Sequence, residues 1–265
     1  MTETERSPAP TARAIFLVLA GTFFLLIACE LLWMGSTAKS KLLVLETLTL
    51  LPVFVFVLVR KYPFRETFRW QRVNGAVLLV SGVIGVGLSI VIDELDTLIQ
   101  ILIPMPEELY QAMREFLLFD TMGELAIIVV ATVVVASFAE EMLFRGFFQG
   151  ALEKMTDVTK AVLVTAFVFA FVHFNPWWFV EILILGVCLG VLVWRSGSIF
   201  PSVIVHGVNN ALSVLLINTG SDTLGWYRFK GHVSPIWLIL GLGCIVFGFR
   251  VFYGLTEKPS SISYS

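Results

Sequence analysis

Charged residues are scarce in this 265-residue sequence, and their scarcity excludes a water-soluble domain of the same size. Asp, Glu, Lys and Arg together make up 14% of the residues, whereas 57% are hydrophobic and 23 are Phe. A soluble domain does not require so apolar a composition. We therefore expect an all-α, polytopic membrane protein whose length suits one compact bundle, and we treat residues 1–265 as a single integral membrane domain.

Cysteine and histidine are also scarce, with three of each. Cys29, Cys188 and Cys244 fall inside apolar segments and lack both the CxxC spacing of a metal site and the pattern of a disulfide framework, so we expect them to be packing residues. The net charge of -2 gives no reason to expect nucleic acid or another polyanion as a partner. The HExxH motif, which places two zinc-binding imidazoles on one helix, does not occur.

Apolar runs close to the length of about 20 residues that crosses a bilayer predict a bundle of about eight transmembrane helices. The runs are 15–34, 42–59, 75–92, 125–144, 161–173, 177–194, 199–217 and 235–253. The fifth run is short, and the fourth is expected to extend as far as about Lys154. The first run continues without a break through "ELLWM", which favours an uncleaved first helix over a lipoprotein signal.

The distribution of basic residues predicts the orientation of the bundle. The connection between the second and third runs is strongly basic, with Arg60, Lys61, Arg65, Arg69 and Arg72, whereas the next connection is acidic. Lys and Arg resist translocation, so we expect the basic connection and both termini in the cytoplasm, and a plasma (inner) membrane location if the cell is prokaryotic. In the acidic connection, "LDTLIQILIP" and "EELYQAMREFLLF" have the apolar spacing of amphipathic surface helices.

Three ionisable residues stand at the end of the fourth apolar run, in "FAEEMLFRGF". Charged groups in hydrocarbon are costly, so they normally face a bundle interior or a water-filled cavity and find partners there. Glu141 and Arg145 are four residues apart in the favourable order, so we expect them to pair. Glu140 points about 100° away on a helix and stays available. A purely structural ion-pair network is the alternative at this point.

Two of the three histidines also lie in apolar runs, and the position of His173 can be compared with that of Glu140. A turn is expected near residues 155–158, and each of the two residues is about 16 positions away from it. At about 1.5 Å per residue they lie at similar heights on antiparallel helices. They are therefore able to face each other.

His206 and Asn210 follow the next turn on the same side of the bundle, expected at residues 195–198. They are four residues apart and share one helix face. Their height matches that of Glu140 if the hairpin of the fourth and fifth runs projects about 10 Å beyond the bilayer. Together these side chains provide a base that activates water, a proton carrier and donors for an oxyanion, which are the parts of a hydrolytic site.

Other polar residues within or between the runs are interpreted as structural. Glu30, Glu46 and Glu181 have no matching partner four residues away, and Asn209 points to a different helix face from Asn210. His232 is expected to be a solvated loop residue. The segment "NPWW" reads as a turn with aromatic residues near the membrane interface.

Three short motifs carry a resemblance to a known family. "EEMLFR" (140–145), "FAFVH" (169–173) and "HGVNN" (206–210) resemble the EExxxR, FxxxH and HxxxN motifs of the CPBP family of intramembrane proteases, which includes the type II CAAX prenyl endopeptidases such as the Ras-converting enzyme. They occur in the right order within residues 124–217, which form the expected catalytic core, and the helix count fits as well.

The resemblance implies a peptidase in which Glu140 and His173 activate water. By the same resemblance His206 and Asn210 stabilise the oxyanion. Three supporting residues are implied to stabilise the structure of the site or to bind the terminus of the substrate: Glu141, Arg145 and Phe169. The implied partners are the lipid bilayer and a peptide or protein substrate, for example a lipidated CAAX-type C-terminus, a bacteriocin precursor or a membrane-bound regulatory protein.

The cofactor and the function class each have an alternative. The family is often described as metalloproteases, and Glu140, His173 and His206 could together bind a catalytic zinc ion. The same three side chains fit glutamate-based catalysis, so we favour a reaction with neither metal nor another cofactor. The alternative function is a membrane transporter or scaffold with a buried Glu, Arg and His network. Transporters often show internal repeats, and the two halves of this sequence show no self-similarity.

Overall fold

The computed structural model describes residues 10–34 and 38–256, and most of them are helical. Residues 1–9 and 257–265, which include both termini, lie outside the described residues. The first half of the chain contains α1 (Ala12–Leu32), α2 (Ser40–Thr49), α3 (Leu51–Val59), α4 (Phe64–Thr67), α5 (Gly75–Leu102) and α6 (Glu107–Leu117). The second half contains α7 (Met122–Ile128), η1 (Val129–Ala136), α8 (Ser137–Glu140), η2 (Glu141–Gln149), α9 (Gly150–Leu152), α10 (Val158–Phe171), α11 (Phe179–Ser196), α12 (Phe200–Asn218), η3 (Ser221–Leu224), β1 (Arg228–Phe229), β2 (His232–Val233) and α13 (Pro235–Leu255).

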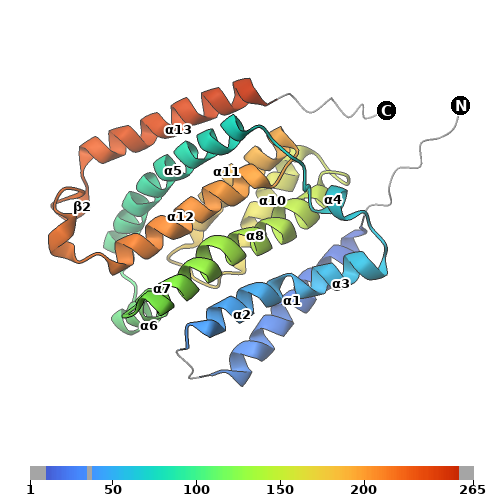
Figure 1. The fold of residues 1–265 in the computed structure, drawn as a ribbon, viewed down its shortest axis with the longest axis horizontal. Helices are drawn as coiled ribbons and strands as arrows, with labels where there is room; N and C mark the ends of the chain where they lie inside the picture. Colours follow the sequence, from blue (N-terminus) through green and yellow to red (C-terminus); the bar gives the residue numbers. More distant parts are fainter. Residues whose placement is uncertain (1–9, 35–37, 257–265) are drawn as a thin grey trace, which may run out of the picture.

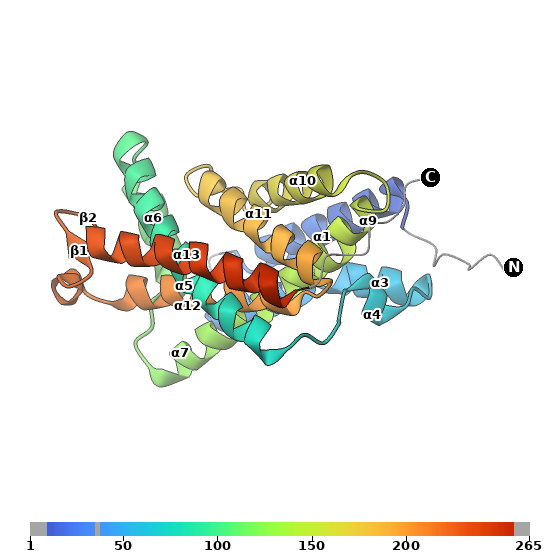
Figure 2. The same cartoon turned by 90° about the horizontal axis from the view of Figure 1, so that it is seen from above.

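Seven helices in this described part of the chain are long and apolar enough to cross a membrane. The chain is therefore an all-α, polytopic membrane protein, as predicted. The eighth apolar helix, α10, has 14 residues and is shorter than a bilayer span. α1 begins and α13 ends toward the same end of the bundle (Figures 1 and 2). The orientation of that end toward the cytoplasm remains a prediction.

A long central helix runs from Met122 to Leu152 through α7, η1, α8, η2 and α9. Its N-terminus is capped by Thr121, whose side chain accepts a hydrogen bond from the amide of Glu124. η1 and η2 are π-helical, a geometry that occurs often at functional sites. α2 packs along η1 and α8, α12 packs on another side, and α10 contacts η2. The predicted extension of the fourth run beyond Arg145 is confirmed.

α5 packs against α12 and α13 and is longer than its apolar run (Figure 1). It continues to Leu102, so the expectation that "LDTLIQILIP" is a separate surface helix is wrong. Its outer part is stabilised by the hairpin of β1 and β2: Arg228 Nη2 donates to Asp93 at 2.7 Å, and His232 Nδ1 contacts Glu94 at 2.9 Å. The second predicted surface helix is α6.

α10 and α11 form an antiparallel pair beside the central helix. The side chain of Asp157 caps α10 by accepting a hydrogen bond from the amide of Lys160, and this bond holds the pKa of Asp157 below its usual value. After α10 the chain turns through residues 172–178, where Asn175 Oδ1 accepts hydrogen bonds from the amides of Trp177 and Trp178. The predicted "NPWW" turn is confirmed. α11 ends at Ser196 and is capped by Gly197, which has a φ of 68°.

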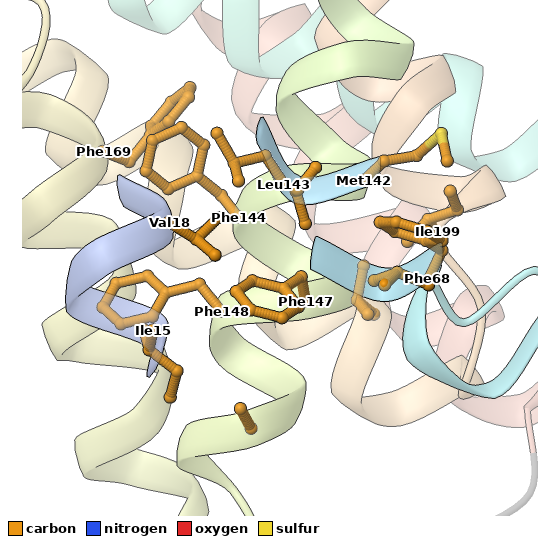
Figure 3. Packing of buried hydrophobic residues seen from close by; sticks show 14 of the residues in the cluster. Ile15, Val18, Phe68, Met142, Leu143, Phe144, Phe147, Phe148, Phe169 and Ile199 are labelled. Carbon is orange, nitrogen blue, oxygen red and sulfur yellow. The ribbon is translucent and has the colours of Figure 1, made fainter. Parts of the chain in front are cut away.

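The largest apolar cluster surrounds η2 and contains aromatic side chains from several elements (Figure 3). Ile15 and Val18 of α1 pack there against Phe144 and Phe148. A second cluster joins α5, α11, α12 and α13. The η2 segment, which carries charged groups, is thus enclosed by apolar packing on its other sides.

Candidate active site

Glu141, Arg145 and Gln149 follow one another by one helical turn on the central helix, and all three side chains are fully buried. Arg145 Nη1 donates to Glu141 Oε1 at 2.7 Å, so the predicted pair is confirmed. Arg145 Nη2 also donates to the carbonyl of Gly186 at 3.3 Å, and Gln149 Nε2 donates to that of Gly190 at 3.0 Å. Buried charges persist when they are paired and hydrogen-bonded, so α11 helps to stabilise this polar row.

The two glycines of α11 make room for these long side chains. A Cβ atom added at Gly190 would lie 2.8 Å from Gln149 Oε1, and one added at Gly186 would lie 3.3 Å from Arg145 Nη2. The two glycines therefore allow α11 to pack closely against the central helix, and this packing involves buried polar groups as well as apolar ones.

Glu140 faces two imidazoles. Its Oε2 lies 4.0 Å from Nε2 of His173 and 3.8 Å from Nε2 of His206. The side chains of Glu140 and His173 are 16% and 31% exposed, whereas His206 is buried. Glu140 Oε2 itself is buried and has no hydrogen-bond partner among the described residues. An acid from the fourth apolar helix thus meets histidines from the fifth and seventh, as the sequence spacing predicted. His173 lies just after the end of α10, in the turn.

The other ring nitrogen of each histidine is held by an acceptor. His173 Nδ1 lies 2.6 Å from the carbonyl oxygen of Phe169, which can only accept, so the proton of the neutral ring is on Nδ1. His206 Nδ1 lies 3.1 Å from Glu141 Oε1, the carboxylate that also pairs with Arg145. Both Nε2 atoms are left to face Glu140.

Phe169 connects the polar row to the two imidazoles. The Arg145 guanidinium carbon lies 4.0 Å from the centre of its ring, which is cation–π contact. The ring also meets His173 and His206 edge-on, with centroid distances of 4.8 and 5.9 Å. The motif phenylalanine therefore contacts three of the predicted site residues.

Asn210 is placed differently from the other predicted site residues. Its Nδ2 donates to the carbonyl of Thr132 in η1 at 2.8 Å, and within the described residues it forms no hydrogen bond with Glu140 or His173. One amide hydrogen remains beyond that bond. Asn209 Oδ1 accepts a hydrogen bond from Ser89 on α5, which confirms that its side chain points away from the site.

Two residues near the site were not predicted to belong to it. Gln149 continues the four-residue spacing of Glu141 and Arg145, and that spacing is the signal that could have found it. Glu46 on α2 is half-buried and lies close enough to Glu140 for the two carboxyl groups to interact electrostatically. This neighbour comes from another helix, so spacing along α2 gives no sign of it.

Three residues that were interpreted as structural or as solvated have partners of their own: Glu30, Glu181 and His232. Glu30 pairs with Lys41 Nζ at 2.6 Å, and Glu181 interacts with Asp96. The interpretation of Glu30 as structural fits this pairing. His232 contacts Glu94, so it is more than the solvated loop residue that was expected.

A zinc ion was an alternative for Glu140 and the two histidines. Among residues 10–34 and 38–256, no group of three or more His, Cys, Asp and Glu side chains has the spacing to hold a metal ion. We derive no step through a metal, and the metal-free reaction stays a prediction.

One comparison with known proteins finds a match to the part of the chain that carries the candidate site. Residues 122–212 match the family model described as type II CAAX prenyl endopeptidase Rce1-like. No curated protein and no solved structure matches the chain. The matched segment covers the central helix, α10, α11 and the part of α12 with His206 and Asn210. The three motifs that resemble those of the CPBP family all lie within the matched segment, so the match supports that resemblance.

Proposed function

We propose that this protein is an intramembrane endopeptidase in which Glu140 and His173 activate the attacking water. One observation supports this most directly. Glu140 Oε2 lies opposite the Nε2 atoms of His173 and His206, at 4.0 and 3.8 Å, while both Nδ1 atoms are occupied elsewhere. Groups at such distances are too far apart for a direct hydrogen bond and suit one bridging water.

The bridging water is the proposed nucleophile. Glu140 takes a proton from it, and the water oxygen attacks the carbonyl carbon of the substrate. His173 Nε2, unprotonated in the neutral ring, relays that proton to the amide nitrogen as the C–N bond breaks. Water thus supplies the hydroxyl group of the new carboxyl end, and its proton leaves on the new amine. The reaction needs no metal ion.

His206 and Asn210 are the proposed donors to the oxyanion. His206 Nδ1–H is held by Glu141, so donation from Nε2 requires the imidazolium form, whose charge the Glu141 carboxylate balances. Asn210 offers the amide hydrogen that Thr132 does not use. Glu141 and Arg145 are fully buried, which favours a role in holding His206 over a role in binding the substrate terminus.

We propose a CAAX-type C-terminal segment, carried by a lipidated protein, as the substrate class. The family model describes prenyl endopeptidases, and a prenyl chain would partition into the bilayer beside the bundle. We place cleavage near the cytoplasmic face, because the basic connection 60–72 lies at the end of the bundle where the hairpin of α9 and α10 turns.

The test compares site variants with matched variants elsewhere. Glu140→Gln and His173→Gln should each lower the cleavage rate of a prenylated CAAX peptide by about 100-fold or more, because each removes a proton-transfer group. Glu30→Gln and His232→Gln change the same residue types away from the site and should keep the rate. The variants are first shown to elute as folded protein in detergent.

Two results would count against the proposal. Full cleavage by Glu140→Gln would remove the mechanism. Accumulation of a solute in vesicles that contain the protein, without cleavage of any peptide, would favour transport instead.

A further inference from the structure

A short segment between α4 and α5 lies directly on η2. We call residues 68–71 the clasp. Phe68 is fully buried, and its backbone packs on Gly146: a Cβ atom added there would lie 2.8 Å from Phe68 Cα and 3.0 Å from its carbonyl oxygen. Arg69 has a φ of 50°, a conformation that residues other than glycine keep only when their surroundings enforce it. The clasp is therefore held firmly against the central helix.

The Arg69 side chain joins the clasp to the buried polar row. Both terminal nitrogens of its guanidinium contact the carboxylate of Glu153, one of them at 3.2 Å. Glu153 Oε1 also accepts from Gln149 Nε2 at 2.8 Å, one turn beyond Arg145. The guanidinium crosses over Gly150, where a Cβ atom would lie 3.3 Å from Arg69 Nε. A planar fork meeting a carboxylate with two contacts fixes orientation as well as distance.

The same segment holds the beginning of α12, the helix that carries His206. The carbonyl of Arg69 accepts a hydrogen bond from the amide of Ile199 at 3.1 Å, and that of Gln71 accepts one from Ser198 Oγ at 2.6 Å. Phe68 and Ile199 belong to one apolar cluster, shown in Figure 3. The clasp therefore contacts both helices that contribute to the bond between Glu141 and His206.

We propose that Arg69 is a positioning residue for His206. The bond between His206 Nδ1 and Glu141 Oε1 is 3.1 Å long and joins α12 to the central helix. His206 lies seven residues after Ile199, which is about 10 Å of rigid helix. If the beginning of α12 moves relative to η2 at the clasp, the His206 ring therefore moves with it. That movement changes the distance from His206 Nε2 to Glu140. The effect of Arg69 on the position of His206 does not depend on the proposed function. Its expected effect on catalysis rests on that function.

The position of His206 can be measured without any peptidase assay, because the chain has only three histidines. In protein with His173→Gln and His232→Gln, the single remaining histidine is His206, and ¹⁵N NMR reports its ring. We expect one signal set with the proton on Nδ1. Adding Arg69→Ala should split or shift that set, and adding Arg65→Ala, a change of an exposed arginine in the same connection, should not. An unchanged spectrum with Arg69→Ala overturns the proposal.

Activity provides the second readout, in protein that keeps all three histidines. Arg69→Ala should lower kcat by about 10- to 100-fold, as misplacement by about 1 Å does, with little change in KM and an altered pH profile of kcat. Arg69→Lys keeps the charge but loses the fork and should be intermediate. The exchange Arg69→Glu with Glu153→Arg should restore part of the loss. A lower melting temperature with an unchanged kcat and pH profile would assign Arg69 a structural role only.

The two proposals fail in different ways. If Glu140→Gln retains full cleavage, the proposed function fails, while the NMR result still decides whether the clasp positions His206.

Discussion

At the scale of single residues, Phe169 is an apolar side chain that touches three ionisable groups at once. Its ring stacks on the Arg145 guanidinium and meets two imidazoles edge-on. A cation over an aromatic face is stabilised by about 0.5 to 2 kcal/mol, with the larger values where the cation is desolvated, as Arg145 is. The ring thus contributes to the placement of charges and not only to packing.

We predict that Phe169→Leu lowers cleavage activity more than a comparable core change does. Leucine fills much of the space but has no ring face for Arg145. Phe147→Leu removes a ring of the same cluster that is equally buried and contacts Phe56 instead. Peptide cleavage and thermal unfolding, measured for both variants, separate the two effects. Equal losses of activity would contradict a special role for the Phe169 ring.

Spacing along the chain was informative for residues on one helix face. Glu141 with Arg145, and the equal heights of Glu140 and His173, followed from helical geometry. Glu46 and the Thr132 partner of Asn210 did not, because each contact joins different helices and depends on how these helices rotate about their axes. The chemical roles of all these residues stay predictions until variants are measured.

At the scale of elements, α11 approaches the central helix closely because two glycines face it. Gly190 is the tighter of the two sites: an added Cβ atom would lie 2.8 Å from Gln149 Oε1 and 3.0 Å from Val162 Cγ1. Little space is available for either atom to move, since Gln149 is fully buried and Val162 is nearly so.

We therefore predict that Gly190→Ala destabilises the protein by about 1 to 3 kcal/mol through overpacking. Gly243→Ala is the matched control, because Gly243 lies inside α13 and an added Cβ atom there meets nothing within 4 Å. It should be neutral or stabilising by up to about 1 kcal/mol, since alanine is the better helix former. Thermal unfolding in detergent measures both. Equal stability of the two variants would be inconsistent with a tight seam at Gly190.

The sequence predicted the end of a helix correctly where an apolar segment is followed by a charged one. It predicted the end wrongly where a charged residue within the helix pairs with a residue far away along the chain. The extension of α5 beyond residue 92 depends on Arg228, Tyr227 and His232, which lie more than 130 positions away and neutralise or hydrogen-bond Asp93 and Glu94. A prediction from hydropathy ends the helix just before Asp93, because hydropathy does not include the contribution of these distant partners. The existence and order of the apolar helices needed no such knowledge.

At the scale of the whole molecule, the choice between glutamate-based and zinc-based chemistry can be tested directly. We predict that purified protein retains its cleavage rate after treatment with a chelator and dialysis, and that added zinc does not raise the rate. A zinc peptidase treated in the same buffer is the control and should lose activity. Reversible loss in the chelator, with recovery at one zinc per protein, would overturn the metal-free mechanism.

The short length of α10 has a consequence for the surrounding lipid. Its 14 residues reach about 21 Å, whereas the hydrocarbon core is about 30 Å thick. Its outward face is apolar, with Leu163, Val164, Phe167 and Phe171 exposed, so acyl chains cover it only to that height. If α10 lies in the bilayer, this difference in length is a hydrophobic mismatch that the adjacent lipid accommodates by thinning. We therefore expect a locally thinner bilayer next to His173, where a membrane-anchored polypeptide would leave the lipid phase.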